Sequence, residues 1–390
     1  MILAAPSVLL PDGSAERGFV EVTDSTITGV SAHAPTPVAS QDAVDPTVAP
    51  EQVDLEALGI THLAPGFVDI HNHGGGGAAF TEGAVAAARA VALHRSHGTT
   101  SLMASLVTDT IDRLAEQVAA LAPLVEAGEL VGVHLEGPWL SDLHCGAHDP
   151  MLLRDPDIAD IDRVLDAGEG TVAMVTLAVE RPGGLEAVAH LAARGVIAAP
   201  GHSDAGYEIA KEAVAAGASV ATHLFNAERP MHHRVPGLIP ALLESPSVAI
   251  ELIADGVHVH PVMLRHAITC APTRYVLVTD AMAAAGAPDG DYRLGPLRVR
   301  VQDSVARLDP GGAIAGSTLT LDRAVRFLVE QVGVPVPEAV RAATLVPAET
   351  IGRADLGRLA PGARADLVAL GEDLQVRAVM RGGRWVVPPC

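Results

Sequence analysis

The chain has 390 residues, of which 49% are hydrophobic, and its mean hydropathy is +0.30. This composition excludes a disordered chain and allows one barrel-sized domain with a smaller appendage. The formal net charge of -21 argues against nucleic acid and anionic membrane surfaces as partners. No apolar run reaches the length of a membrane span, and the first residues lack the basic segment of a signal peptide.

Both ends of the chain predict short strands joined by turns. Residues 1–62 predict short strands with a turn at Asp24-Ser25, and residues 34–49 predict a loop rich in Pro, Ala, Val and Ser. Residues 355–390 predict further strands around glycine turns. We therefore expect residues 1–62 and 355–390 to form one small, discontinuous β-sandwich domain.

Between the two ends, apolar segments alternate with segments of helical periodicity. The clearest helical patterns lie at 83–97, 111–127, 185–194 and 207–216. This alternation predicts a parallel sheet, and eight apolar segments predict closure into a (β/α)8, TIM-like barrel over residues 63–354. A hairpin insert is expected at 298–308, and further helices at 318–332 and 338–343. The eight expected strands lie at 66–71, 99–106, 130–135, 171–178, 196–200, 219–223, 249–254 and 275–279.

The first expected barrel strand ends in two histidines one residue apart, His71 and His73. Side chains alternate between the faces of a strand, so both imidazoles point the same way and can hold one metal ion. A single histidine after an apolar run is more often an ordinary structural residue than a ligand. The pair favours ligation, because two imidazoles on one face gain little from packing.

Residues of catalytic type also follow four later strands. Glu136 follows the third strand, His202 the fifth, His223 the sixth and Asp280 the eighth. Barrel enzymes build their active sites at the carboxyl ends of the strands, so we expect these side chains to converge. Imidazole and carboxylate ligands suit zinc, with iron, manganese or cobalt as alternatives.

A carboxylate can bridge two ions, whereas a neutral imidazole binds one. We therefore expect Glu136, His202 and His223 to hold one divalent ion. A second ion, bridged by Glu136, is expected between His71 and His73.

Two neighbouring features complete this hypothesis. His134 shares a strand face with Glu136 and is expected to support the ligands from behind. A carbamylated lysine on the fourth strand, a common alternative bridge, is excluded because the only lysine, Lys211, lies in an expected helix.

Asp280 is the candidate general base and general acid. A metal lowers the pKa of a water that it binds, and a nearby carboxylate can accept the proton and pass it to a leaving amine. Alternatively, Asp280 is a further ligand or caps the following helix. The pattern favours metal-assisted hydrolysis of a C–N bond, most naturally an amide.

Five segments in order along nearly the whole chain resemble the N-acetylglucosamine-6-phosphate deacetylases, a family of the amidohydrolase superfamily. The closing segment at 361–367 resembles the last strand of that superfamily. The five segments are HLEGPW at 134–139, GHSD at 201–204, THLFNA at 222–227, ADGVH at 254–258 and VTDA at 278–281.

This resemblance implies a metal-dependent enzyme that removes acetate from N-acetyl-D-glucosamine 6-phosphate. It matches Glu136, His202 and His223 to the family's metal ligands, and Asp280 to its catalytic aspartate. His148 matches a histidine that contacts the sugar and orients or polarises the reacting amide.

The resemblance also implies how the substrate is bound. Asn226, the backbone of Ala227, Arg234 and His258 match the sugar and phosphate contacts. Arg234 is then expected to come from the neighbouring subunit of a homodimer. Arginine and histidine can hold a phosphate dianion in an otherwise acidic protein.

The sequence departs from the family pattern in several places. Some family members lack the first histidine pair and use one metal, whereas this chain matches the two-metal subgroup. Phe225, Glu228 and Val235 stand where members often carry Tyr, Met and Glu, which leaves the substrate range open. Cys145, before His148, is interpreted as an ordinary buried thiol, with substrate contact as the alternative.

Two rival functions remain open from the sequence. A related amidohydrolase, such as a D-aminoacylase or a dihydroorotase-like enzyme, would need no phosphate-binding arginine. A barrel that only binds a phosphosugar would need no proton shuttle at Asp280. The three cysteines, including Cys270 and Cys390, are far apart and predict no disulfide framework, which fits a reducing cytoplasm.

Overall fold

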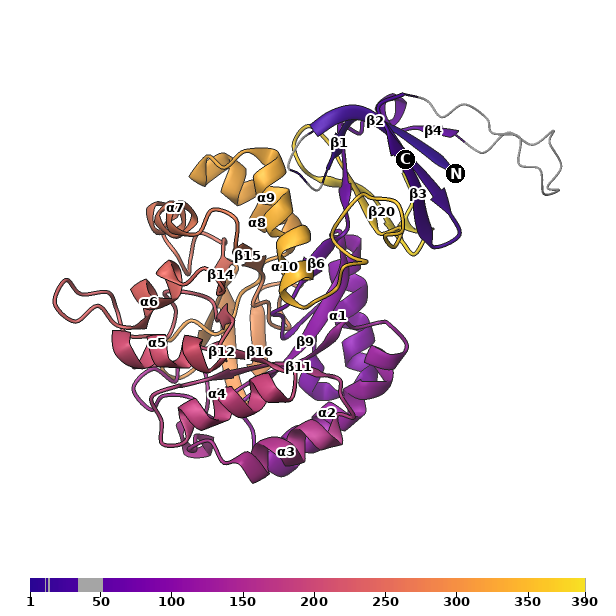
Figure 1. Cartoon of the computed structure of the whole chain (residues 1–390). Coiled ribbons are helices and arrows are strands. Elements are labelled where there is room, and N and C mark those ends of the chain that lie inside the picture. Colours follow the sequence, from indigo (N-terminus) through magenta and orange to yellow (C-terminus); the bar gives the residue numbers. More distant parts are fainter. Residues whose placement is uncertain (11, 13–14, 34–51, 390) are drawn as a thin grey trace. The chain divides into compact units, whose positions relative to one another are not determined.

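The computed structural model describes residues 1–389 except 11, 13–14 and 34–51, so the expected loop at 34–49 lies outside the described residues (Figure 1). The chain divides into two compact units. The first comprises Met1–Val68, Arg95–Thr100 and Val334–Cys390. The second comprises Asp69–His94 and Ser101–Gly333.

The first unit is built on one eight-stranded sheet that takes strands from both ends of the chain. Its order is β21-β20-β19-β5-β1-β2-β3, and β4 pairs with β1. The expected turn at Asp24-Ser25 is confirmed, because Thr23 pairs with Thr26 between β2 and β3. The strands are β1 (Ile2–Leu9), β2 (Ala15–Thr23), β3 (Thr26–Ser31), β4 (Gln52–Asp54), β5 (His62–Pro65), β19 (Leu367–Leu370), β20 (Val376–Arg381) and β21 (Arg384–Val387).

One apolar cluster forms the core of this sheet. Leu3 and Val20 come from the first strands of the chain, and Leu367 and Met380 come from the last. All four are buried together. Removing these side chains from water stabilises the pairing of the two chain ends.

Most of the parallel sheet lies in the second unit, and Figure 1 shows helices α2 to α5 on its outer side. Phe67–Val68 of β6 and Thr99–Thr100 of β9 belong to the first unit. Five strands pair in the order β12-β11-β10-β9-β6, and three pair in the order β13-β14-β15. All nine residues of β9 are buried, as expected for a strand covered on both faces. The strands are β6 (Phe67–Asp69), β9 (Thr99–Val107), β10 (Gly132–Glu136), β11 (Val172–Leu177), β12 (Ile197–Pro200), β13 (Val220–Ala221), β14 (Ala249–Ile253) and β15 (Tyr275–Val278).

Hydrogen bonds join these two sets of strands at both edges. Thr222 N donates to the Pro200 carbonyl oxygen over 3.2 Å, which links β13 to β12. Asp280 N donates to the His71 carbonyl oxygen over 2.9 Å, which links the end of β15 to the end of β6. The parallel sheet is therefore curled, in a manner consistent with a TIM-like barrel.

The helices between the strands bury one apolar side each. In α2, Leu114, Val118 and Leu121 are buried, and Thr110 caps the helix by accepting a hydrogen bond from the backbone of Arg113 over 3.4 Å. None of the described helices is long and apolar enough to cross a bilayer. The helices are α1 (Ala84–Ser96), α2 (Ile111–Glu126), α3 (Ile158–Ala167), α4 (Gly184–Ala193), α5 (Tyr207–Ala216), α6 (Leu238–Glu244) and α7 (Pro261–Cys270).

The segment after β15 differs from the expectation. The predicted hairpin at 298–308 is part of a three-stranded antiparallel sheet of β16 (Gly290–Leu294), β17 (Leu297–Gln302) and β18 (Val305–Leu308). The predicted helix at 318–332 begins only at α8 (Leu321–Phe327) and continues as the π-helix η4 (Leu328–Val332). In the first unit, α9 (Val336–Ala342) is followed by α10 (Leu345–Thr350), which the sequence pattern did not predict.

Short elements complete the described chain. They are the 3-10 helices η1 (Glu56–Leu58), η2 (Phe80–Glu82) and η3 (Pro150–Leu152), and the strands β7 (Gly74–Gly75) and β8 (Ala78–Ala79).

Candidate active site

The residues expected to act on a substrate lie at the carboxyl ends of the parallel strands. Glu136 is the last residue of β10, and His71, His202, His223 and Asp280 follow β6, β12, β13 and β15. These five side chains come from distant parts of the sequence. They meet because parallel strands present their carboxyl ends at one rim.

Three of these residues leave their strands through an unusual backbone conformation. The φ angles are 48° at His202, 24° at His223 and 48° at Asp280. Non-glycine residues rarely adopt the left-handed region, and a residue held there costs about 1–3 kcal/mol. Other non-glycine residues with a positive φ lie elsewhere in the chain, but these three fall at strand ends that carry candidate catalytic side chains, where such strain is commonly found.

The carboxylate of Glu136 lies at the centre of the cluster. Its Oε1 is 3.0 Å from Nε2 of His223 and 3.1 Å from Nε2 of His202. Its Oε2 is 3.1 Å from Nε2 of His73 and 3.3 Å from Nε2 of His148. One carboxylate therefore lies within 3.3 Å of four imidazoles, each through the same ring nitrogen.

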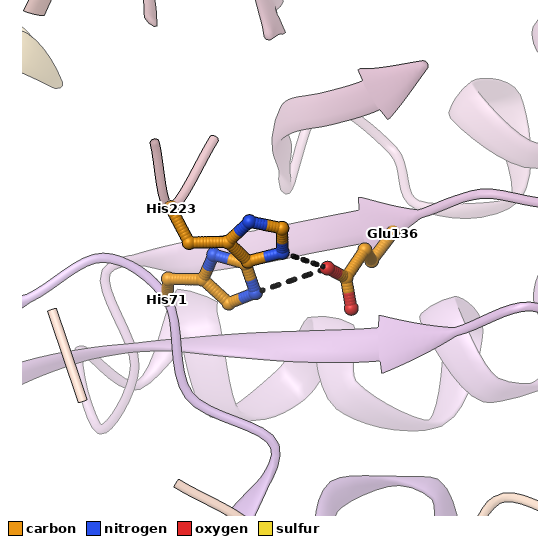
Figure 2. Close-up of side chains that lie close together, drawn as sticks. All are labelled: His71, Glu136 and His223. Carbon is orange, nitrogen blue, oxygen red and sulfur yellow. Dashed lines mark hydrogen bonds and ion pairs between the residues drawn. The ribbon is translucent and has the colours of Figure 1, made fainter. Parts of the chain in front are cut away.

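His71 also contacts the cluster through Nε2. Figure 2 shows His71 and His223 both directed at one oxygen of Glu136, at 3.6 Å from Nε2 of His71. Nε2 of His71 is also 3.3 Å from Nε2 of His73 and 3.5 Å from Oδ1 of Asp280. The same Asp280 oxygen lies 3.2 Å from Nε2 of His73.

The charges of the cluster depend on one another. Burial alone would raise the pKa of Glu136, but the imidazoles of His71 and His148 outweigh burial and hold it well below its usual value. Burial also acts to raise the pKa of Asp280, but His73 and His71 lower it to about 2. Both carboxylates are thus ionised and require positive charge beside them.

Protons on imidazoles can supply part of that charge. Burial lowers the pKa of His73, but contact with Asp280 and Glu136 reverses this effect and raises it to about 9. A divalent cation among the same atoms would supply the charge without protonated rings.

The donor atoms fit such a cation. Three overlapping groups of buried residues each offer three ligand atoms within 4.8 Å of one another. Nitrogen from imidazole and oxygen from carboxylate are ligands that zinc and other first-row metals prefer. The groups are His71, Glu136 and His223; His71, His73 and Asp280; and Glu136, His148 and His202. Asp280 is thus within reach of the position expected for the second ion.

The outward ring nitrogens of three of these histidines are also held, whereas Nδ1 of His223 makes no hydrogen bond to a described residue. Nδ1 of His71 is 3.0 Å from Oε2 of Glu251, and Nδ1 of His202 is 3.0 Å from the His144 carbonyl oxygen. Nδ1 of His73 is 3.2 Å from the Ser105 carbonyl oxygen. Such partners orient an imidazole and leave its other nitrogen for a metal.

His134 lies one layer behind the cluster, as the sequence indicated. Its Nδ1 is 2.8 Å from Oγ of Ser105, and its Nε2 is 2.8 Å from Oγ1 of Thr176. Its ring packs against His71 with centroids 4.5 Å apart. Burial lowers the pKa of His134 well below its usual value, so the ring is neutral.

A buried polar network joins the ends of β6 and β15. Oγ1 of Thr279 donates to Oδ2 of Asp69 over 2.6 Å, and Nδ2 of Asn72 donates to the same oxygen over 3.1 Å. Nδ2 of Asn72 is also 2.8 Å from Oγ1 of Thr279. Burial raises the pKa of Asp69 to about 6, against the opposing effect of these hydrogen bonds. The network fixes the strand end that carries His71 relative to the one that carries Asp280.

A cavity of about 290 Å³ opens above the cluster. His148, Asn226, Ala227 and His258 line it, together with the ligand-type residues His73, Glu136, His202, His223 and Asp280. Cys145 is half-buried and is not among the lining residues.

Two predicted site residues do not line this cavity: His71, which is buried against Glu136 and His73, and Arg234. Arg234 is exposed, in the loop between β13 and α6, which projects from the unit in Figure 1.

Sequence reasoning missed several residues that hold the site. Glu251 is a lone acidic residue inside an apolar strand, and that anomaly could have revealed it. Asp69 lies two residues before His71, on the same strand face, so the alternation that identified the histidine pair also applied to it. Thr108 and Ser105 gave no comparable signal, because hydroxyl residues are common near strand ends.

Comparison with known proteins agrees with this geometry. The family model described as "Amidohydrolase family" matches residues 62–386. The chain is 37% identical over 349 residues to an N-acetylgalactosamine-6-phosphate deacetylase of Escherichia coli, covering 88% of this chain and 92% of the relative. It is 35% identical over 339 residues to an N-acetylglucosamine-6-phosphate deacetylase of Vibrio furnissii, covering 85% of each.

Solved structures give the same result. The crystal structure of N-acetyl-D-glucosamine-6-phosphate deacetylase from Mycobacterium smegmatis is 48% identical, with a TM-score of 0.92 over 99% of this chain and 100% of that one. A mutant of that enzyme has been solved in complex with N-acetyl-D-glucosamine-6-phosphate. The chain therefore belongs to the amidohydrolase family.

Proposed function

We propose that this protein hydrolyses the acetamide of N-acetyl-D-glucosamine 6-phosphate, giving D-glucosamine 6-phosphate and acetate. The observation that carries the proposal is the convergence of Glu136, His202, His223 and Asp280 at one cavity. The relatives named as deacetylases of hexosamine 6-phosphates support the substrate class.

The residues fit one or two divalent metal ions, most naturally zinc. Glu136, His202 and His223 would hold the first ion, and His71 with His73 would hold a second that Glu136 bridges. Such an ion lowers the pKa of a water that it binds and polarises the substrate carbonyl.

Asp280 acts as the proton carrier. Its low pKa keeps the carboxylate ionised, so it can accept a proton from the attacking water. The water oxygen bonds to the acetyl carbon, the C–N bond breaks, and Asp280 returns the proton to the amine nitrogen. The left-handed backbone at Asp280 turns the carboxylate towards the cavity that it lines.

His148 would donate a hydrogen bond to the substrate carbonyl oxygen from Nε2, which lies 3.3 Å from Oε2 of Glu136. The backbone N–H of Thr108 donates to Nδ1 of His148 over 3.3 Å, so the neutral ring carries its proton on Nε2. Burial lowers the pKa of His148 to about 4, which keeps the ring neutral. A donor fixed in this way stabilises negative charge that develops on the carbonyl oxygen.

The remaining lining residues suit the sugar phosphate. Asn226, the backbone of Ala227 and His258 would contact the substrate, and His258 carries positive character beside Asp255, 2.6 Å from its Nδ1. In a homodimer, Arg234 would contact the phosphate of the substrate that is bound in the neighbouring subunit. Its exposure, away from the cavity of its own chain, supports this role.

A charged sugar phosphate crosses a bilayer at high cost, so we propose that the enzyme works in the cytoplasm.

The proposed architecture is a (β/α)8 barrel at residues 63–354 and a β-sandwich formed by residues 1–62 and 355–390. The hydrogen bonds at both edges of the parallel sheet support closure of the barrel. The shared core of the first and last strands, with Ile27 N donating to the Ala363 carbonyl oxygen over 2.9 Å, supports a sheet folded over itself.

Acetate release tests the activity. The purified protein, loaded with zinc, should release acetate from N-acetyl-D-glucosamine 6-phosphate much faster than from the unphosphorylated sugar. The galactosamine epimer belongs in the same assay, because one relative is named for it. Saturable binding without acetate would indicate a phosphosugar-binding protein instead.

Arg234→Ala separates the deacetylase from its enzymatic rival. If Arg234 binds phosphate, the variant raises KM for the phosphorylated sugar and leaves kcat nearly unchanged, because the contact is equal in ground state and transition state. An enzyme of the D-aminoacylase type would hydrolyse an N-acetyl-D-amino acid and be indifferent to this substitution.

A further inference from the structure

Glu251 is an acidic residue in an apolar setting. It lies in the middle of β14, between Ile250 and Leu252, and its side chain is fully buried. A carboxylate taken out of water is unfavourable unless hydrogen bonds replace its hydration. The contacts that Glu251 makes therefore need an explanation.

Both hydrogen bonds of this carboxylate go to candidate metal ligands. Oε2 of Glu251 lies 3.0 Å from Nδ1 of His71, and it accepts the backbone N–H of His223 over 3.1 Å. The other oxygen, Oε1, makes no hydrogen bond to any described residue. The carboxylate is therefore aimed at the two histidines and is not part of a wider stabilising network.

The backbone of Glu251 holds the same segment. Its carbonyl oxygen accepts the backbone N–H of Leu224 over 2.9 Å. Residue 223 adopts a φ of 24°, a conformation that needs support from its surroundings. Glu251 supplies this support from its side chain and its main chain together.

The contact with His71 decides which edge of its ring faces the cluster. With Nδ1 against Glu251, the opposite nitrogen Nε2 lies 3.3 Å from Nε2 of His73 and 3.5 Å from Oδ1 of Asp280. A carboxylate that accepts from one imidazole nitrogen fixes the ring and strengthens the other nitrogen as a ligand.

We propose that Glu251 is a positioning residue that orients His71 and His223 together. Because one carboxylate contacts a ligand of each ion, the affinity for the ion at His71 and His73 depends on how His223 is held at the other ion. The proposal rests on the metal-dependent function proposed above. His71 is held through its ring and His223 only through its backbone, so loss of Glu251 affects the ion at His71 and His73 more strongly.

Two substitutions test this role without substrate. Glu251→Ala removes the acceptor, and Glu251→Gln keeps an oxygen that can accept both hydrogen bonds while removing the charge. We expect metal affinity at the His71 position to fall about 100-fold in the alanine variant and about 10-fold in the glutamine variant. Competition with a chromophoric chelator measures affinity, and the absorption spectrum of the cobalt-loaded protein reports the ligand geometry.

Glu228→Gln is the matched control. Glu228 is also a buried carboxyl with one oxygen that makes no hydrogen bond to a described residue, but its hydrogen bond goes to the backbone of Phe225 and to no imidazole. This variant should bind metal as the wild type does. A purely structural role for Glu251 would lower the melting temperature in the variants and leave affinity and cobalt spectrum unchanged.

The outcomes are separable. If Glu251→Ala does not fold, the glutamine variant decides, and wild-type affinity in that variant overturns the proposal. If the wild-type protein itself binds no divalent metal, the proposed function fails. If the wild type binds metal and both Glu251 variants bind it equally well, only the positioning role fails.

Discussion

Oε1 of Glu136 lies 3.0 Å from Nε2 of His223, although 87 residues separate the two in the sequence (Figure 2). The carboxylate comes from the end of β10 and the imidazole follows β13. Because both are buried, their attraction is weakly screened by solvent.

Replacement of Asp280 should separate catalysis from metal binding. Asp280→Asn keeps the shape of the side chain but cannot accept a proton, so we expect kcat to fall by about 100- to 10,000-fold. Glu136, His202 and His223 are unchanged, so the ion that they would hold remains. Acetate release checks the loss of turnover, and metal content measured on the same preparation checks that the ion is retained. Substantial turnover by this variant would contradict the role of Asp280 as proton carrier.

Removal of metal should inactivate and destabilise the protein. A ligand present at about 100 times its Kd stabilises the folded state by about 2.7 kcal/mol, and chelation removes this contribution. We expect a lower melting temperature after dialysis against a chelator, and recovery of acetate release when zinc is restored. His202→Ala should lower metal content before any chelator is added, whereas Lys211→Ala, on exposed helix surface, should not. Unchanged metal content in His202→Ala would contradict the ligand assignment.

Gly146 should not tolerate even a methyl group. Its φ is 59°, and a Cβ there would lie 2.9 Å from Cε1 of His202. Gly170 has a φ of 87° with no atom within 4 Å of such a Cβ, so Gly170→Ala carries the backbone strain alone. We expect Gly146→Ala to lower kcat/KM by about 10- to 100-fold, because small displacements of a ligand are costly. Gly170→Ala should lose stability but keep its kinetic constants; equal kinetics in both variants would show that His202 is not displaced.

Glu228 should make stability depend on pH. Burial raises its pKa from 4.5 to about 8, against the smaller opposing effect of the Phe225 backbone hydrogen bond. The unfolded chain therefore loses this proton at lower pH than the folded protein, so the contribution of Glu228 to stability is lost as pH rises from about 4.5 towards 8. Glu228→Gln cannot ionise. Relative to the wild type, it should gain about 2–5 kcal/mol of unfolding free energy between pH 5 and pH 8.

Urea unfolding at both pH values measures this difference. Glu208→Gln, on the exposed side of α5, removes a solvated carboxylate and should follow the wild type. A constant difference between Glu228→Gln and the wild type across this range would mean that Glu228 is hydrated or paired in solution.

The sequence predicted the alternating strands and helices well where one periodicity was strong. The helix expected at 207–216 has the bounds of α5, and the helix expected at 111–127 ends one residue earlier, at Glu126. The predicted hairpin at 298–308 lacked one strand, β16, because the sequence there mixes polar and apolar residues. In β16 the residues Asp291, Tyr292 and Arg293 are polar or partly exposed, so no apolar alternation marked the strand.

The sequence by itself determined which residues could take part in chemistry. His71, His73, Glu136, His202, His223 and Asp280 each follow an apolar strand, and parallel strands bring such positions together whatever the loops between them. Only the tertiary structure decided how they are held. The contacts of Glu251 with His71 and His223, and of Gly146 with His202, join strands or loops that are distant in sequence. Local periodicity reports which face of an element is buried, but it does not report which side chain lies opposite.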